Sequence, residues 1–131
     1  MHVEPATRNL PLILARELAS NLATPLAIID ADGTLVFFNE PAELIIGRTP
    51  SELGELSEEA WRARFSATHP DGSPATLDDM PTVQARRGRA PAHATLVVTN
   101  DGRTRTLEVT AFPLLVGDTE IAGVVCLFWE A

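Results

Sequence analysis

Two pairs of adjacent carboxylates are the residues of this 131-residue chain best placed for acid–base chemistry. They are Glu58-Glu59 and Asp78-Asp79, and general acid–base catalysis needs two such groups brought together in a cleft. Each pair, however, stands at the predicted start of a helix, where carboxylates interact favourably with the helix dipole. The sequence therefore assigns both pairs a capping role and predicts no catalytic residue.

Motifs for nucleophilic, phosphate or metal chemistry are absent from the sequence. It contains no Gly-x-Ser-x-Gly, no phosphate-binding glycine loop, no His-Glu-x-x-His and no Cys/His spacing suited to zinc. An enzyme would have to be assembled from scattered residues, as in small cone-shaped α+β isomerases, and this is kept as a remote alternative. We expect no enzyme and no metal site.

The three histidines and the single cysteine have unremarkable sequence contexts. His2 is close to the N-terminus, His69 lies in a loop rich in Pro and Gly, and His93 lies near the start of a predicted strand. Cys126 lies inside the apolar run 123–129, which predicts a buried, unreactive thiol. A single cysteine excludes an internal disulfide, and a cytoplasmic location is the default expectation.

Charge and hydropathy exclude several kinds of partner. Eighteen acidic and ten basic residues give a net charge of −8, which disfavours binding to nucleic acid and to anionic lipid surfaces. No apolar run approaches the ~20 residues that span a bilayer, and no signal-like segment opens the chain. We expect neither a nucleic-acid nor a membrane partner.

The most informative stretch begins with two short apolar runs in residues 26–38, which predict a β-hairpin with Asp30 and Gly33 in its turn. Asn39 then stands where a helix needs a side-chain acceptor for its unpaired amides. Gly47 can end that helix in a left-handed conformation. A strand, turn, strand, short helix unit follows from these residues.

Apolar residues at steps of three and four predict an amphipathic helix over residues 9–22. Such a helix must cover apolar surface, either on its own sheet or on a second copy of the chain, and the sequence leaves both open. The apolar stripe consists of Leu10, Ile13, Leu14, Leu18 and Leu22.

Three further helical segments are predicted in the middle of the chain. The first is a short helical turn within residues 48–54. The second begins at Ser57, and its Trp61 and Phe65 are expected to face the core. The third spans residues 77–88, and Gly88 is expected to terminate it. Residues 68–75, THPDGSPA, read as a surface loop before this third segment.

The remainder of the chain predicts three antiparallel strands, over residues 92–99, 103–115 and 120–129, separated by turns at 100–102 and Gly117-Asp118. Together with the hairpin they form an α+β fold. We predict a five-stranded antiparallel sheet, with the helices inserted between strands two and three and an amphipathic N-terminal helix in front. The expected division is a flanking helix in residues 1–23 and one domain in residues 24–131.

These segments together resemble a PAS domain, the Per-Arnt-Sim sensor fold, of the bacterial signalling type. The resemblance covers residues 24–130 and rests on DADGTLVFFN with PAELIIG, on HPDGSPATLDDMPTVQARRG, on DGRTRTLEVTAFPL and on IAGVVCLFW. It implies a sheet curled around a pocket that the inserted helices close, and any ligand is expected in that pocket. Because fold alone does not give function, the resemblance implies no particular ligand.

The sequence lacks the residues that members of this family use to hold their known cofactors. Its flavin photosensors use a cysteine in a helix ahead of the central helix, where this chain has none. Its haem-binding members use a histidine on the long helix, which corresponds to residues 77–88 and contains none. A photoactive-yellow type of chromophore needs a reactive cysteine, and Cys126 lies among apolar residues. The resemblance thus disfavours haem and flavin adducts and leaves the cofactor unknown.

A signal-transduction module that binds a small apolar or amphipathic molecule in the pocket is the first functional hypothesis. The same residues could instead fill the core of a domain without a ligand, and at each position that alternative stays open. The candidate lining residues are Ile29, Leu35, Phe37, Leu77, Met80, Val83, Val97, Leu107, Val109 and Val125.

A module for self-association or docking is the second hypothesis, and it predicts a homodimer. Its surface would combine the N-terminal stripe with an apolar outer face of the sheet, which needs a cover from a folded-back or swapped helix. Signals would pass to a partner or an output domain as the sheet shifts against flanking helices. The initial Met fits a native N-terminus, and the end after the last strand fits a stand-alone protein or a fragment of a larger sensor. The candidate sheet residues are Val98, Phe112, Leu114 and Phe128.

Overall fold

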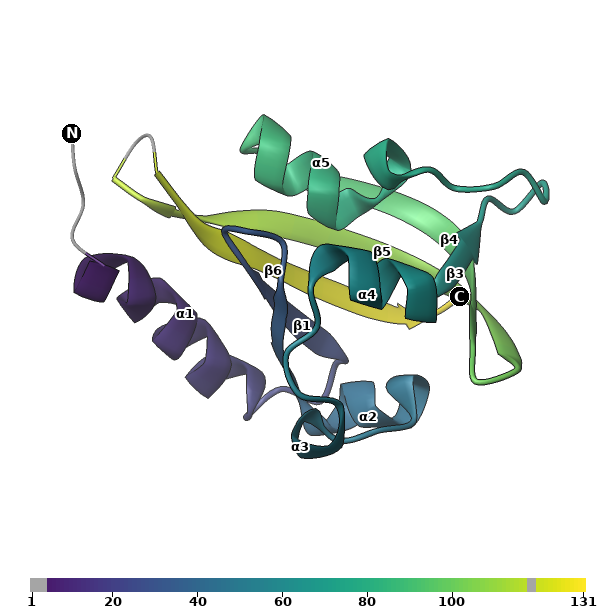
Figure 1. Cartoon of the computed structure of the whole chain (residues 1–131), viewed down its shortest axis with the longest axis horizontal. Coiled ribbons are helices and arrows are strands. Elements are labelled where there is room, and N and C mark those ends of the chain that lie inside the picture. The colour runs from purple at the N-terminus through teal and green to yellow at the C-terminus, as the bar shows by residue number, and fades with distance from the viewer. Residues whose placement is uncertain (1–4, 118–119) are drawn as a thin grey trace.

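A twisted antiparallel sheet and the helices on its two sides make up the structure, a computed structural model that describes residues 5–117 and 120–131, with side chains from Leu10 onward (Figure 1). His2 and Asp118, named above, lie outside the described residues. The helices are α1 (Pro5–Ala19), α2 (Glu40–Ile46), α3 (Pro50–Leu53), α4 (Glu58–Arg64), the 3-10 helix η1 (Leu77–Asp79) and α5 (Pro81–Gly88). The strands are β1 (Leu26–Asp30), β2 (Leu35–Phe38), β3 (Ser66–Thr68), β4 (Ala92–Asn100), β5 (Arg103–Val116) and β6 (Glu120–Glu130).

The sheet has the strand order β2-β1-β6-β5-β4-β3 in the described part of the chain. The prediction of an antiparallel α+β sheet is confirmed, but the expected number of five strands is wrong. The sixth strand, β3, pairs with the edge of β4, from Ser66 opposite Thr99 to Thr68 opposite Val97. Three residues are too few to show the alternation of apolar and polar residues that marks a strand in a sequence. The formation of β3 therefore depends on pairing with the free backbone groups at the edge of β4 and not on its own sequence pattern.

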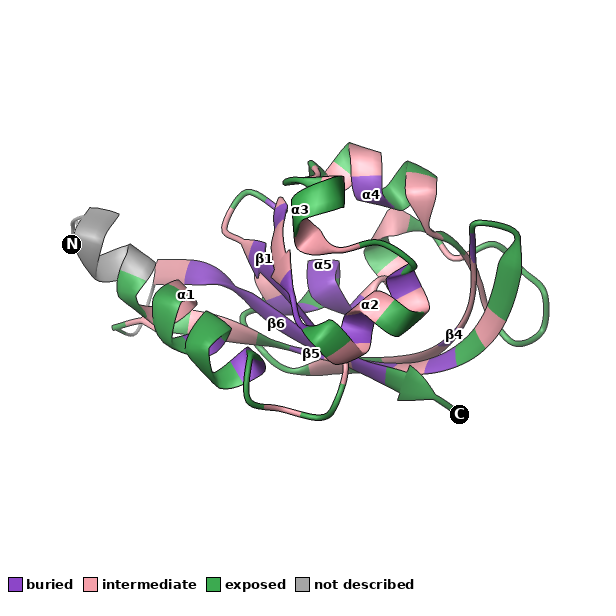
Figure 2. Ribbon diagram, turned by 90° about the horizontal axis from the view of Figure 1, so that it is seen from below, coloured by how far each residue is buried: buried purple, intermediate pink, exposed green. Residues whose placement is uncertain are grey.

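The two faces of the sheet carry different helices. Figure 2 shows α1 on one side of the sheet and α2 to α5 on the other. Because successive side chains of a strand point to opposite faces, the sheet supports two apolar clusters. We call the side under α2 to α5 the inner face and the side under α1 the outer face. The buried members of the outer cluster are Ala15, Ala19, Leu26, Ile28 and Val125.

Asn39 joins the two faces at the start of α2. It is 2% exposed, and its Oδ1 accepts hydrogen bonds from the amides of Leu26, at 2.9 Å, and Ala42, at 3.2 Å. Its Nδ2 donates to the carbonyl of Ala19 at 3.0 Å and to that of Thr24 at 2.9 Å. This one side chain therefore ties the end of α1 to β1 and caps α2.

The ends of the other helices follow ordinary backbone chemistry. Gly47 closes α2 in the left-handed region, at φ 80°. The expected helix over residues 77–88 is broken at Met80, which is extended because it precedes Pro81. The helix ends at Gly88, as expected, but Gly88 itself does not take the left-handed conformation. Gly88 is the last helical residue, and Arg89, at φ 54°, takes the left-handed conformation after it.

Helix α1 packs on the sheet through its small residues. Ala15 and Ala19 are buried against the outer face, whereas Leu10, Ile13, Leu14 and Leu18 of the stripe are more than half exposed. At Gly123 of β6 a Cβ would lie 2.8 Å from Leu12 Cδ2 and would also meet the Ile29 carbonyl. The missing side chain of Gly123 therefore lets α1 approach β6 closely.

The remaining apolar face of α1 is open to solvent. Leu10 is 52% exposed, and Ile13, Leu14 and Leu18 are each 60% exposed. Leu22 lies beyond the end of the helix and is half-buried against the outer cluster. No helix in the described part of the chain is long and apolar enough to cross a membrane. Most of the stripe is therefore left open to solvent.

Candidate functional site

An apolar cavity of about 130 Å³ lies between the inner face of the sheet and helices α2, α4 and α5. Strands β1, β2, β4, β5 and β6 all contribute to its wall, so the curl of the sheet forms most of the enclosure. The lining residues are Ala27, Ile29, Leu35, Ile45, Ile46, Trp61, Phe65, Met80, Pro81, Thr82, Leu96, Val98, Asn100, Arg105, Leu107, Val109, Cys126 and Phe128.

Half of the residues expected to line the pocket do line this cavity: Ile29, Leu35, Met80, Leu107 and Val109. The other five do not. Phe37 and Val125 pack in the outer cluster, and Val97 alternates with Leu96 and Val98, which line the cavity. Val83 is buried in α5 and Leu77 half-buried in η1, both away from the wall.

Of the four residues expected on the outer face of the sheet, two lie there and two do not. Phe112 and Leu114 lie on the outer face, as two walls of a groove described below. Val98 and Phe128 were expected beside them but line the inner cavity. The cause is strand register, since a shift of one residue sends a side chain to the opposite face.

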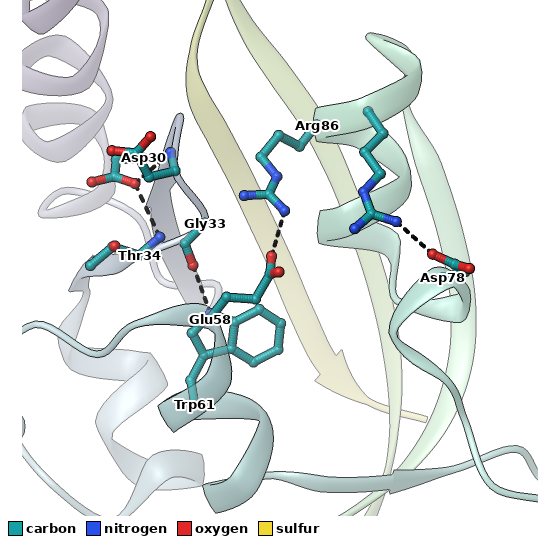
Figure 3. A network of polar contacts seen from close by, with 9 residues as sticks. Asp30, Gly33, Thr34, Glu58, Trp61, Asp78 and Arg86 are labelled. Carbon is teal, nitrogen blue, oxygen red and sulfur yellow. Dashed lines mark hydrogen bonds and ion pairs between the residues drawn. The ribbon is translucent and has the colours of Figure 1, made fainter.

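A polar network joins α4 and α5 to the β1–β2 turn beside the cavity (Figure 3). The indole Nε1 of Trp61, whose ring lines the cavity, donates to the carbonyl of Gly33 at 2.9 Å. Arg86 of α5 donates to Glu58 of α4 at 2.6 Å, and both side chains are largely buried. Gly33 is at φ 90°, and an added Cβ would meet Arg86 and Glu58 there. The turn, α4 and α5 are thereby fixed to one another.

Asn100 and Arg105 form a polar end of the cavity beside the C-terminus of α2. The Nδ2 of Asn100 donates to the carbonyl of Ile46 at 2.7 Å. Arg105 donates to the carbonyl of Ile45 at 3.3 Å and, through Nε, to Glu130 at 3.0 Å. Both side chains thus satisfy carbonyls that the end of a helix leaves unpaired. Sequence reasoning missed both residues. Asn100 reads as part of the turn at residues 100–102, and Arg105 reads as an ordinary residue inside a strand.

Cys126 lines the cavity as a free thiol in the middle of β6. Burial raises the pKa of Cys126 to about 12, because the thiolate would lose its hydration. At neutral pH the thiol is protonated and is a poor nucleophile. Its position and its pKa agree with an inert, apolar part of the wall.

The pairs His69–Asp79 and His93–Glu108 lie outside the cavity. His69 contacts Asp79 at 2.9 Å, and hydrogen bonds from the Thr76 backbone and from His69 lower the pKa of Asp79. His93 contacts Glu108 at 2.7 Å. No His, Asp or Glu lines the cavity, and the described residues contain no cluster of three groups that could hold a metal ion.

A second apolar feature is a groove between α1 and the outer face of the sheet. It is lined by Pro11, Leu14, Ala15, Leu18, Leu22, Leu26, Phe112, Leu114, Val125 and Leu127. Phe112 is 38% exposed at its edge. The groove continues into the open stripe of α1, so the outer face and α1 form one apolar surface, which we call the outer surface.

Comparison with known proteins gives the following matches. The model of the PAS fold matches residues 19–131, whereas no curated protein matches the chain. The PAS domain of nitrogen regulation protein NR(II) from Vibrio parahaemolyticus has a TM-score of 0.64 at 18% identity, over 90% of this chain and 98% of that chain.

Two further solved structures are similar. The phage VqmA–DPO complex has a TM-score of 0.65 at 13% identity, over 95% of this chain and 55% of that chain. The light-state dimer of the fungal blue-light photoreceptor Vivid has a TM-score of 0.61 at 12% identity, over 98% of this chain and 95% of that chain. Identities this low carry information on the fold alone.

Proposed function

The chain belongs to the PAS family, and from this premise we propose that it is a sensory module that binds a small molecule in its inner cavity. The observation that carries the proposal is the cavity itself, which is lined by residues of five strands and three helices and has an almost wholly apolar wall. Pockets of this kind, with a few placed polar groups, are the usual sites of small ligands. The phage VqmA–DPO complex has a similar fold.

Filling the cavity should remove ligand binding without removing the fold. Val109→Trp places a large ring into the wall, and we expect a small mass retained by the wild-type protein in native mass spectrometry to be lost. Circular dichroism should show the same secondary structure, at a stability cost of about 1–3 kcal/mol for overpacking. Absorbance in the near-ultraviolet and visible range would identify a coloured ligand class.

Val97→Trp is the matched control, because Val97 lies on the outer side of the same sheet and does not line the cavity. It should keep the retained mass. A retained mass in Val109→Trp equal to that of the wild type would place binding elsewhere and would contradict the proposal.

We propose self-association through the outer surface as a second role, favoured by the four large side chains that α1 leaves more than half exposed. Contiguous apolar patches are rare on monomers and mark interaction sites. Arg16 of α1 stacks on Phe37 of β2, with its guanidinium carbon 4.7 Å from the ring centre. This contact helps to hold α1 against the sheet. The similar structure of Vivid is a light-state dimer.

Charges in the outer surface should convert a dimer into a monomer. Replacing both Leu14 and Leu18 by Glu places two carboxylates in the apolar contact, and we expect light scattering to give half of the wild-type mass. The folded monomer should survive, because both side chains are 60% exposed. Leu44→Glu is the control, since Leu44 is 80% exposed on α2 at the opposite side of the sheet. Equal masses in the double variant and the wild type would contradict the dimer role.

The two roles share the same strands. Cys126 and Phe128 line the cavity, whereas Val125 and Leu127 of the same strand line the outer groove. A ligand that shifts β6 therefore also shifts the surface offered to a second copy or to a signalling partner. We propose this coupling as the route from binding to output, with no catalytic step.

A further inference from the structure

The wall of the inner cavity offers a ligand almost no polar group, although polar residues contribute to it. Trp61 uses its Nε1 to donate to the carbonyl of Gly33 at 2.9 Å. Arg105 donates to Glu130 at 3.0 Å and to the carbonyl of Ile45 at 3.3 Å. The hydrogen-bonding atoms of these two side chains are thus engaged with the protein, and the surface that they turn to the cavity is almost wholly apolar.

Two further polar atoms belong to lining residues but do not form part of the cavity surface. They are Thr82 Oγ1 and Asn100 Oδ1, which are buried and have no hydrogen-bond partner in the described part of the chain. Because the surface of the cavity is almost wholly apolar, neither atom is presented to a ligand. A hydroxyl or amide of a ligand would therefore lose its hydrogen bonds to water and gain none here, and a charged group would lose still more.

The size and the composition of the wall suit a single aromatic ring. The cavity has a volume of about 130 Å³, and a dry apolar cavity of about 150 Å³ accepts benzene. Trp61, Phe65 and Phe128 supply aromatic faces and edges to the wall. Met80 and Cys126 add two sulfur atoms, and sulfur makes favourable contacts with aromatic rings.

We infer that the cavity selects an uncharged aromatic hydrocarbon with a single ring and rejects molecules of the same size that carry a hydrogen-bonding group. This inference rests on the proposed function and adds to it the chemical class of the ligand. The affinity comes from moving apolar surface out of water into an apolar enclosure. The selectivity comes from the cost of burying a polar group without a partner.

Toluene and phenol test this directly, because a hydroxyl replaces the methyl group at nearly the same size. We expect the wild-type protein to bind toluene with a Kd at least about tenfold below that of phenol. Titrations followed by two-dimensional NMR give both constants. Val109→Trp fills the cavity and should abolish toluene binding. Toluene binding that persists in Val109→Trp would place the probe elsewhere and would contradict the inference.

A hydroxyl introduced into the wall should weaken the selection. Val109→Thr keeps the shape of the side chain and adds a donor and an acceptor to the cavity. We expect the preference for toluene over phenol to shrink at least about threefold, because phenol gains a hydrogen-bond partner. Val97→Thr is the matched control on the outer side of the same sheet, and both constants should stay at their wild-type values. An unchanged preference in Val109→Thr would show that the apolar wall does not set the selectivity.

The outcomes separate this inference from the proposed function. Phenol binding to the wild type as tightly as toluene would overturn the apolar selection while leaving the cavity a ligand site. Binding of neither probe at millimolar concentration would also overturn the inference. A small polar molecule retained by the wild type and lost in Val109→Trp would then still support the proposed function.

Discussion

Above pH 9 the free energy of unfolding is expected to fall by about 1.4 kcal/mol for each pH unit, because one buried thiol controls the alkaline stability. Burial raises the pKa of Cys126 to about 12, whereas an unfolded thiol titrates near pH 8.5–9. Between these values the unfolded chain has lost a proton that the folded chain retains. Stability is therefore unaffected below the unfolded pKa and falls as pH rises through this window.

The composition of the chain makes this effect easy to isolate. It contains no tyrosine, and its ten basic residues are all arginine, which stays protonated in this range. Urea unfolding at pH 8, 9, 10 and 11 measures the slope. Cys126→Ala should start from a lower stability and lack the slope. A parallel decline in both proteins would show that the thiol does not control it.

Asn39→Ala is expected to lower the free energy of unfolding by at least about 3 kcal/mol, the range reached when a buried hydrogen-bond network is broken. The substitution leaves the amides of Leu26 and Ala42 without their acceptor. It also leaves the carbonyls of Ala19 and Thr24 without their donor. Urea unfolding of the variant and the wild type measures the difference.

Thr49→Ala provides the comparison, because Thr49 is also an N-cap and lies at the start of the short helix α3. Its capping bonds are at the surface, and their loss should cost about 1 kcal/mol. Asn39→Asp keeps the acceptors and removes the donors, so its cost reports on the two carbonyls and on burying a charge. An Asn39→Ala cost no larger than that of Thr49→Ala would contradict the central role of Asn39.

Local rules made much of the fold predictable from sequence. The hairpin, the cap at Asn39 and the last three strands depend on neighbouring residues, and the structure has each of them. The strand β3 was not predictable, because three residues carry no periodicity of their own. The end of α5 at Gly88 agrees with the prediction, but the left-handed residue that closes the helix is Arg89 and not a glycine.

The site was predictable only in part. A sequence pattern shows that side chains alternate between the two faces of a strand, but it does not show which of the two sets faces the cavity. Val97 and Val98 are equivalent as apolar residues, and only the packing of the whole sheet sends Val98 into the cavity. The polar atoms of Asn100 and Thr82 are informative for a different reason. Their lack of partners is a property of the three-dimensional arrangement, which no single residue in the sequence encodes.

Helix α1 is attached to the rest of the domain at two points, so a movement at one of them tilts the whole helix. Leu12 sits in the notch at Gly123 of β6, and the Ala19 carbonyl is held by Asn39. Seven residues of helix span about 10 Å, so moving the Leu12 anchor by about 1 Å across the axis, with Ala19 fixed, tilts the helix by about 6°. The far end at Pro5, about 21 Å from Ala19, would swing by about 2 Å. A shift of about 1 Å in the sheet at Gly123 would thus be doubled at the far end of the helix.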